Sequence, residues 1–135
     1  MKELRIDAQV ENIRNVTEFI DAQLEEYNCD MMAQMQIDIA IDEIFSNIAC
    51  YAYAPDTGTV KIAVEITENP KSAKITFTDS GIPYNPLEKA DPDITLSAEE
   101  REIGGLGIYM VKKTMDSMVY EYKDGQNILS IIKNI

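Results

Sequence analysis

The sequence predicts an α+β fold in which a mixed, mostly antiparallel sheet carries its helices on one face. The spacing of apolar residues changes several times between a period of two, typical of strands, and a period near 3.6, typical of helices. The resulting order is strand, helix, helix, strand, strand, helix, strand, strand, which favours antiparallel hairpins with the helices gathered on one side. With 135 residues and a 45% apolar fraction, we expect one domain around a single core.

The first part of the chain is predicted to form a strand and two helices. Apolar residues alternate over residues 4–8, which indicates a strand, and recur at helical spacing from Ile13 to Tyr27. A second helix is predicted from about Met31 to Tyr53, because isoleucines form one stripe along it and Pro55 follows.

Two hairpins flank a third helix in the rest of the chain. The predicted strands are residues 60–66 and 75–77 around a turn at 69–71, and residues 118–122 and 128–132 around Asp124-Gly125. The third helix begins at about Gly105, with lysines near its C-terminal end, where the helix dipole favours cations. Residues 84–103 lack a periodic pattern and are rich in proline and acidic residues, so we expect a lid or binding loop there.

Composition excludes several classes of protein. No apolar stretch is long enough for a membrane span and the N-terminus lacks a signal-peptide block, so we expect a soluble, cytoplasmic protein. The chain has no histidine, which excludes Ser-His-Asp and Cys-His nucleophile systems and a zinc site built on histidine. Cys29 and Cys50 are expected to be reduced, packed thiols. The net charge of −12 argues against direct binding to nucleic acid.

A carboxylate and an amide stand one turn apart on the predicted second helix, at Glu43 and Asn47. Residues four apart share one side of a helix, and this pair borders the apolar stripe. A solvent-facing edge is the ordinary explanation of such a pair, since burying either group without a partner is costly. The functional interpretation is a general base beside a hard oxygen ligand suited to Mg²⁺.

Two glycine-containing segments complete the pattern. Asp79 follows a strand and precedes Gly81 in the run Asp-Ser-Gly-Ile-Pro, which a turn alone would explain. Its functional interpretation is that Asp79 accepts a hydrogen bond from an exocyclic amine while Gly81 lets a flat ring lie against the backbone. Gly104-Gly105-Leu106-Gly107 opens the third helix, and its backbone N–H groups and helix N-terminus suit phosphate oxygens. It is not a Walker loop, because no Gly-Lys-Ser/Thr occurs.

In this order, the three segments resemble the N, G1 and G2 boxes of the Bergerat-fold ATPases, also called the GHKL superfamily. The run from Glu100 to Lys113 is most similar to the anti-sigma factor serine-protein kinases. The resemblance implies a two-layer Bergerat sandwich over residues 1–135, a histidine-kinase-like ATPase domain with residues 84–103 as the nucleotide lid.

The resemblance also implies a role for each site residue. Glu43 would be the general base, Asn47 the Mg²⁺ ligand, Asp79 the acceptor for the adenine amino group, and Gly81 the glycine beneath the base. Gly105, Leu106 and Gly107 would hold the phosphates, and Arg101 would contact the γ-phosphate or the protein substrate. Tyr51 stands where relatives often carry a basic or histidine residue, and we give it no catalytic role.

The expected function is that of a Mg-ATP-dependent serine/threonine protein kinase acting on an anti-sigma-factor antagonist protein, with sequestration of a sigma factor as a further expectation. A different class of function is a non-catalytic ATP- or ADP-binding interaction module. A third is the detached ATPase domain of a histidine kinase. The presence of Glu43 favours catalysis over binding alone. The sequence leaves open the partner and the choice between monomer and homodimer.

Overall fold

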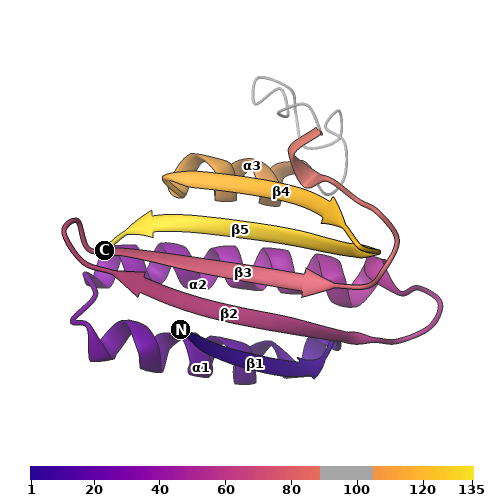
Figure 1. Ribbon diagram of the computed structural model, residues 1–135, viewed down its shortest axis with the longest axis horizontal. Helices are drawn as coiled ribbons and strands as arrows, with labels where there is room; N and C mark the ends of the chain where they lie inside the picture. The colour runs from indigo at the N-terminus through magenta and orange to yellow at the C-terminus, as the bar shows by residue number, and fades with distance from the viewer. Residues whose placement is uncertain (89–104) are drawn as a thin grey trace.

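The computed structural model describes residues 1–88 and 105–135. Within these residues the fold has two layers, a sheet and three α-helices that cover one of its faces (Figure 1). The strands are β1 (Lys2–Asp7), β2 (Thr59–Thr67), β3 (Ser72–Asp79), β4 (Ser117–Lys123) and β5 (Gln126–Asn134); the helices are α1 (Ile13–Glu26), α2 (Met31–Asn47) and α3 (Gly105–Thr114). Short 3-10 turns, η1 (Val10–Asn12) and η3 (Pro86–Glu88), precede α1 and follow β3. The predicted α+β class, element order and two-layer arrangement are confirmed.

The sheet has the strand order β1-β2-β3-β5-β4. We expected a mixed, mostly antiparallel sheet, and the described strands pair antiparallel throughout. Both predicted hairpins, β2–β3 and β4–β5, are present. The pairing of β3 with β5 inserts the C-terminal strand into the middle of the sheet and sets Asp79 directly opposite Asn127.

The core lies between the sheet and the helices. One face of β2 and β3 contributes every second residue, as the period-two pattern predicts, and each helix contributes one stripe. The buried apolar residues include Val60, Ile62, Val64, Ala73, Ile75 and Phe77 from the sheet, and Val16, Ile20, Leu24, Ile37, Ile41 and Ile44 from α1 and α2. Burying each large apolar side chain contributes roughly 1.5–3 kcal/mol. This packing fixes how α2 and β3 lie against each other.

Side chains from loops and strands hold the helix ends. The carboxylate of Asp30 caps α2 by accepting a hydrogen bond from the Ala33 N–H at 3.1 Å. The Lys71 ammonium donates to the carbonyl of Tyr27 just after α1, at 2.7 Å. Lys133 donates likewise to the carbonyl of Thr114 at the end of α3, at 2.7 Å. Cations at helix C-termini also interact favourably with the helix dipole.

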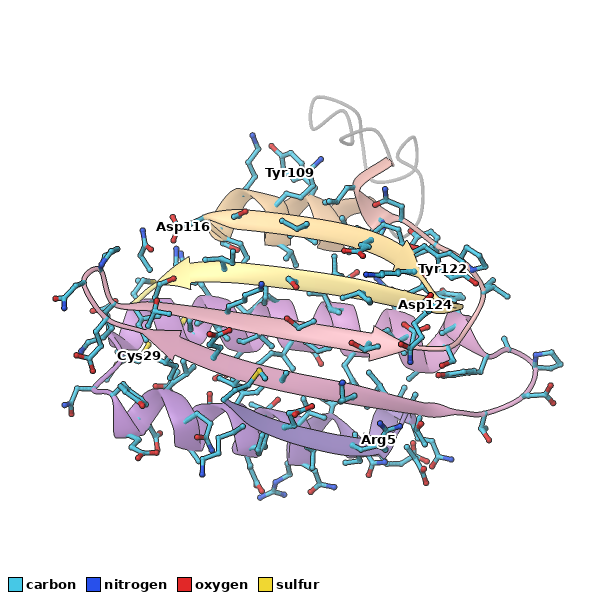
Figure 2. All side chains as sticks on the ribbon, viewed as in Figure 1. Arg5, Cys29, Tyr109, Asp116, Tyr122 and Asp124 are labelled. Carbon is cyan, nitrogen blue, oxygen red and sulfur yellow. The ribbon has the colours of Figure 1, made fainter. Side chains whose placement is uncertain are left out.

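Two expectations need correction. The second helix does not continue regularly to Tyr53: α2 ends at Asn47 and a π-helical turn, η2 (Ile48–Ala52), follows. Cys50 lies in this turn and is exposed rather than packed. Cys29 is half-buried at the α1–α2 connection (Figure 2), where burial and the neighbouring Asp30 carboxylate raise the pKa of its thiol. Both cysteines are free.

None of the described helices is long and apolar enough to cross a membrane.

Candidate functional site

A cavity of about 290 Å³ opens between α2, β3 and β5. It lies at the end of the sheet where β3 ends, which is the end marked by Tyr122 and Asp124 in Figure 2. Most of its lining is apolar or aromatic, and the lining residues include Ile44, Ile48, Tyr51, Ala52, Ile82, Tyr84, Pro86, Ile108, Tyr120 and Leu129. Three polar side chains, Asn47, Asp79 and Asn127, also line it. An apolar cavity with a few placed polar groups is typical of a small-molecule site.

Asp79 is the buried carboxylate of this cavity, with only 5% of its surface exposed. Its Oδ1 atom accepts hydrogen bonds from the backbone N–H of Gly81 at 2.9 Å and from Asn127 Nδ2 at 3.0 Å. Among the described residues, no donor bonds to Oδ2. Since Asp79 lines the cavity, Oδ2 is available as an acceptor for a ligand.

The turn after β3 lies directly against the end of α2. A Cβ atom on Gly81 would be 2.3 Å from the carbonyl oxygen of Ala52, too close for any side chain. The next residue, Ile82, donates its N–H to that same carbonyl at 2.9 Å. Ala52 is the last residue of the π-helical turn that replaces regular α-helix after Asn47, and its carbonyl bonds to Ile82 rather than within the helix. Gly81 is therefore required for close packing of two backbone segments beside the cavity.

Asn127 is a site residue that the sequence analysis missed. Its Nδ2 group donates to Asp79 Oδ1 and to the carbonyl of Ile82 at 2.8 Å. Its Oδ1 atom accepts from the N–H of Tyr84 at 3.1 Å and from the Tyr120 hydroxyl. The side chain thus holds Asp79 and the turn after it in place. The only sequence signal was the Asp124-Gly125 hairpin, which gives no indication that β5 pairs with β3.

Glu43 and Asn47 are in contact on α2, as their spacing predicted. The Asn47 Nδ2 group donates to Glu43 Oε1 at 3.3 Å, and both side chains are half-buried. This bond engages the amide nitrogen of Asn47 and leaves its oxygen as the atom available to a ligand. Asn47 lines the cavity, so a neutral acceptor oxygen stands beside a carboxylate there.

The start of α3 meets Glu43. A Cβ atom on Gly107 would be 2.1 Å from Glu43 Cδ and 2.2–2.3 Å from its carboxylate oxygens, so the glycine backbone lies against this carboxylate. Gly107 is the third residue of α3, close to the positive end of the helix dipole. The structure thereby brings together Glu43, Asn47 and Gly107, and separately Asp79 and Gly81; Asn47 and Asp79 both line the cavity.

The other residues predicted for the site lie partly or wholly outside the part of the chain that the structure describes. Gly105 begins α3, and the side chain of Leu106 is outside the described part. Arg101 and Gly104 fall within residues 89–104, as does most of the predicted lid, and all of these lie outside the described residues.

The chain matches a protein family and several known proteins. The family profile described as histidine kinase-like ATPase domain matches residues 6–133. The chain is 23% identical over 95 residues to the serine/threonine-protein kinase BtrW of Bordetella bronchiseptica, covering 70% of this chain and 66% of that protein. It is 32% identical over 95 residues to the serine-protein kinase RsbW of Bacillus thuringiensis, covering 67% of this chain and 58% of that protein. The chain thus matches about three-fifths of the length of these relatives.

A solved structure shares the fold. The RsbU and RsbW domains of Rv1364c from Mycobacterium tuberculosis match with a TM-score of 0.65 and 17% identity, over 99% of this chain and 32% of that chain. The predicted resemblance to the anti-sigma factor kinases is confirmed by these relatives. Because the family profile covers nearly the whole sequence, this chain belongs to the histidine kinase-like ATPase domain family.

Proposed function

We propose that this protein binds Mg-ATP in the cavity and transfers the γ-phosphate to a serine or threonine of an antagonist protein. The contact between Glu43 and Gly107 carries the proposal. It joins a carboxylate able to accept a proton to the helix N-terminus suited to phosphate, beside Asn47, which lines the cavity together with the buried acceptor Asp79. The kinase names of the relatives support the same conclusion.

Adenine would occupy the end of the cavity formed by β3 and β5. Asp79 Oδ2 would accept a hydrogen bond from the exocyclic amino group, while the Gly81 N–H holds the other carboxylate oxygen, Oδ1, at 2.9 Å. Asn127 orients Asp79 through the 3.0 Å bond to Oδ1. Guanine lacks an amino group at the corresponding position, so the site would select ATP and ADP over GTP.

In the transfer step, Glu43 would accept the proton of the substrate hydroxyl as its oxygen attacks the γ-phosphorus. The bond from the γ-phosphorus to the bridging oxygen breaks, and ADP leaves. Such reactions require positioning, charge stabilisation and a base near the attacking oxygen more than covalent participation by the protein. Backbone N–H groups at the start of α3, around Gly105, Leu106 and Gly107, would hold the phosphates.

The donor set fits Mg²⁺. A carboxamide oxygen is a hard ligand without charge, and the bond from Asn47 Nδ2 to Glu43 leaves this oxygen as the available atom. When bound, Mg²⁺ neutralises phosphate charge, which matters for a protein of net charge −12.

The proposal extends to partners and setting. We propose a cytoplasmic protein with residues 1–135 as one domain, an anti-sigma-factor antagonist as phosphoacceptor and a sigma factor as a second partner, as in the proteins that the sequence resembles. Arg101, in the segment proposed as a lid, would contact the γ-phosphate or the substrate. Sedimentation velocity would show whether the protein acts as a homodimer.

Incubation with γ-labelled Mg-ATP and purified candidate antagonist proteins tests the proposal. Label on a serine or threonine of one antagonist is the expected result. Tight ATP binding without transfer to any antagonist would instead support the non-catalytic module.

A further inference from the structure

The outer face of α2 carries a row of large apolar side chains that the fold leaves uncovered. Met31, Met35 and Ile39 follow one another at four-residue spacing, and 80%, 53% and 57% of their surfaces are exposed. Met32 lies beside them with 60% exposed. By contrast, no large apolar residue of α1 is exposed to this degree. We name these four residues the α2 row. Gathered apolar side chains on a surface mark an interaction site, whereas single ones do not.

The α2 row leads to the proposed general base. Continuing the four-residue spacing from Ile39 reaches Glu43 and then Asn47, still within α2. Residues four apart are neighbours on a helix surface, so Ile39 adjoins Glu43. With a rise of 1.5 Å per residue, Ile39 lies about 6 Å and Met31 about 18 Å from Glu43 along the helix. A protein that covers Met35 and Ile39 therefore reaches the turn of α2 that carries Glu43.

The charge around the row identifies the kind of partner. Helix α2 contains the exposed Asp42 and the half-buried Glu43 and has no lysine or arginine. The adjacent α1 exposes Glu18, Glu25 and Glu26 and has one arginine, Arg14, which is paired with Glu18 at 3.1 Å. This acidic rim repels a second copy of the chain and anionic lipid surfaces, and it attracts a basic protein surface.

We propose that the α2 row is the docking surface for the protein substrate, and that the substrate presents apolar side chains within a basic segment near its phosphoacceptor hydroxyl. This inference rests on the proposed kinase function and names the chemistry of the partner. Methionine suits such a surface, because its flexible thioether adapts to the side chains of a partner.

Three synthetic peptides, each with one central serine, serve as probes. One places leucines at helical spacing among lysines, the second keeps the leucines among glutamates, and the third keeps the lysines without leucines. Fluorescence anisotropy is measured with wild type, the Met35→Gln/Ile39→Gln variant and the control Val119→Gln. Val119 is similarly exposed, at 54%, and pairs with Ser130 on the sheet face opposite the helices. Substitutions at exposed positions should leave the fold intact.

The Leu/Lys peptide should bind wild type and Val119→Gln alike, and should bind Met35→Gln/Ile39→Gln roughly tenfold or more weakly. The other two peptides should bind wild type weakly. Equal binding of the Leu/Lys peptide by all three proteins, equal binding of the Leu/Glu peptide, or no binding to wild type would overturn the inference.

Two further measurements separate this inference from the proposed function and from other occupants. Mg-ATP affinity, measured by calorimetry, should be the same in all three proteins; a wild type that fails to bind Mg-ATP contradicts the proposed function, whatever the peptides do. Flotation of wild type with phosphatidylcholine vesicles that is lost in Met35→Gln/Ile39→Gln would assign the row to a lipid surface. A wild-type dimer in sedimentation velocity that is lost in the same variant would assign the row to a second copy of the chain. Either result would overturn the docking inference.

Discussion

At the scale of single residues, Asp79 and Asn127 form a hydrogen-bonded polar pair in the lining of the cavity. Asp79 contributes a buried acceptor, and Asn127 fixes it while also bonding to the carbonyl of Ile82 and the N–H of Tyr84. A buried carboxylate held in this way has few orientations open to it. In the proposed function, recognition of adenine would therefore depend on the pair rather than on Asp79 alone.

Asp79→Asn should weaken ATP binding by roughly 1–3 kcal/mol, because an amide donor can replace the acceptor that faces the adenine amino group. The bonds to Gly81 and Asn127 can persist, since the asparagine oxygen still accepts. Isothermal titration calorimetry with ATP and GTP measures the change, and Asp7→Asn, an exposed carboxylate on β1, is the control. Unchanged ATP affinity in Asp79→Asn would remove this residue from the site.

Asn127→Ala should lower both stability and ATP affinity, each by roughly 1–3 kcal/mol, because it leaves buried groups without their hydrogen-bond partners. Urea unfolding and ATP titration check the two effects. Asn134→Ala removes an exposed asparagine from the same strand and should change neither. If Asn127→Ala lost stability but bound ATP as wild type does, Asn127 would have a structural role only.

Sequence reasoning reached some of these residues and missed others for physical reasons. The sequence placed Asp79 and Gly81 at the end of a strand, because the apolar alternation stops there and turn residues follow. Asn127 required knowledge that β5 pairs with β3 rather than only with its hairpin neighbour, β4. Local patterns do not specify such a long-range pairing. The same limit applies to Ala52, whose role arises only from the approach of Gly81.

At the scale of elements, the contact of α3 with α2 sets the position of Glu43. Gly107→Ala would place a methyl group about 2 Å from the Glu43 carboxylate, so this side chain would have to move. Alanine favours a helix over glycine by about 1 kcal/mol, so stability should be unchanged or higher while phosphotransfer falls roughly tenfold or more. Thermal unfolding and a labelled-ATP assay measure both. Full transfer by a folded Gly107→Ala protein would show that the position of Glu43 is unimportant.

The packing of α1 on α2 includes two carboxyl groups, Asp21 and Asp38. Their Oδ1 atoms are buried and have no hydrogen-bond partner among the described residues. Burial, the hydrogen bond with Asp21, and the charges of Asp21 and Glu25 raise the pKa of Asp38 to about 8. Asp38 therefore holds a proton at neutral pH.

Because the pKa of Asp38 is higher in the folded than in the unfolded state, the folded protein holds an extra proton between about pH 4 and about pH 8. The stabilisation from this proton is fully present below the unfolded pKa and is lost as pH rises through about 8. After allowance for solvent screening, we expect a loss on the order of 1–2 kcal/mol.

Urea unfolding across this pH range, with Asp38→Asn and the control Asp42→Asn, tests the prediction. Asp38→Asn should flatten the pH dependence, and Asp42→Asn, an exposed residue of the same helix, should retain it. Identical pH profiles in the two variants would contradict a raised pKa of Asp38.

The boundaries of the helices and strands show which parts of the secondary structure could be predicted from sequence patterns. The isoleucine stripe predicted an α-helix to about Tyr53, and the observed α2 ends at Asn47. The π-helical turn that follows was not predicted, because over five residues its apolar pattern resembles that of an α-helix. The two hairpins were predicted, since the turn residues at 69–71 and 124–125 lie within them.

For the molecule as a whole, three segments far apart in sequence meet around one cavity. The sheet pairing places Asp79 at one end, and the packing of α3 on α2 brings Gly107 to Glu43. The order of the segments allowed the family to be predicted, although the sequence could not give the distances between them. The strongly acidic chain gives the site little general attraction for an anion, so in the proposed complex metal and backbone N–H groups would hold the phosphates.

The central claim is that Glu43 acts in chemistry while Asn47 acts in metal-dependent binding. Mg-ATP affinity and phosphotransfer to an antagonist, measured in parallel on wild type, Glu43→Gln and Asn47→Ala, test it most directly. Glu43→Gln should bind Mg-ATP nearly as wild type does and lose transfer by roughly 10²–10⁴-fold, whereas Asn47→Ala should lose Mg-dependent affinity and transfer together. Transfer at the wild-type rate by Glu43→Gln would contradict the account.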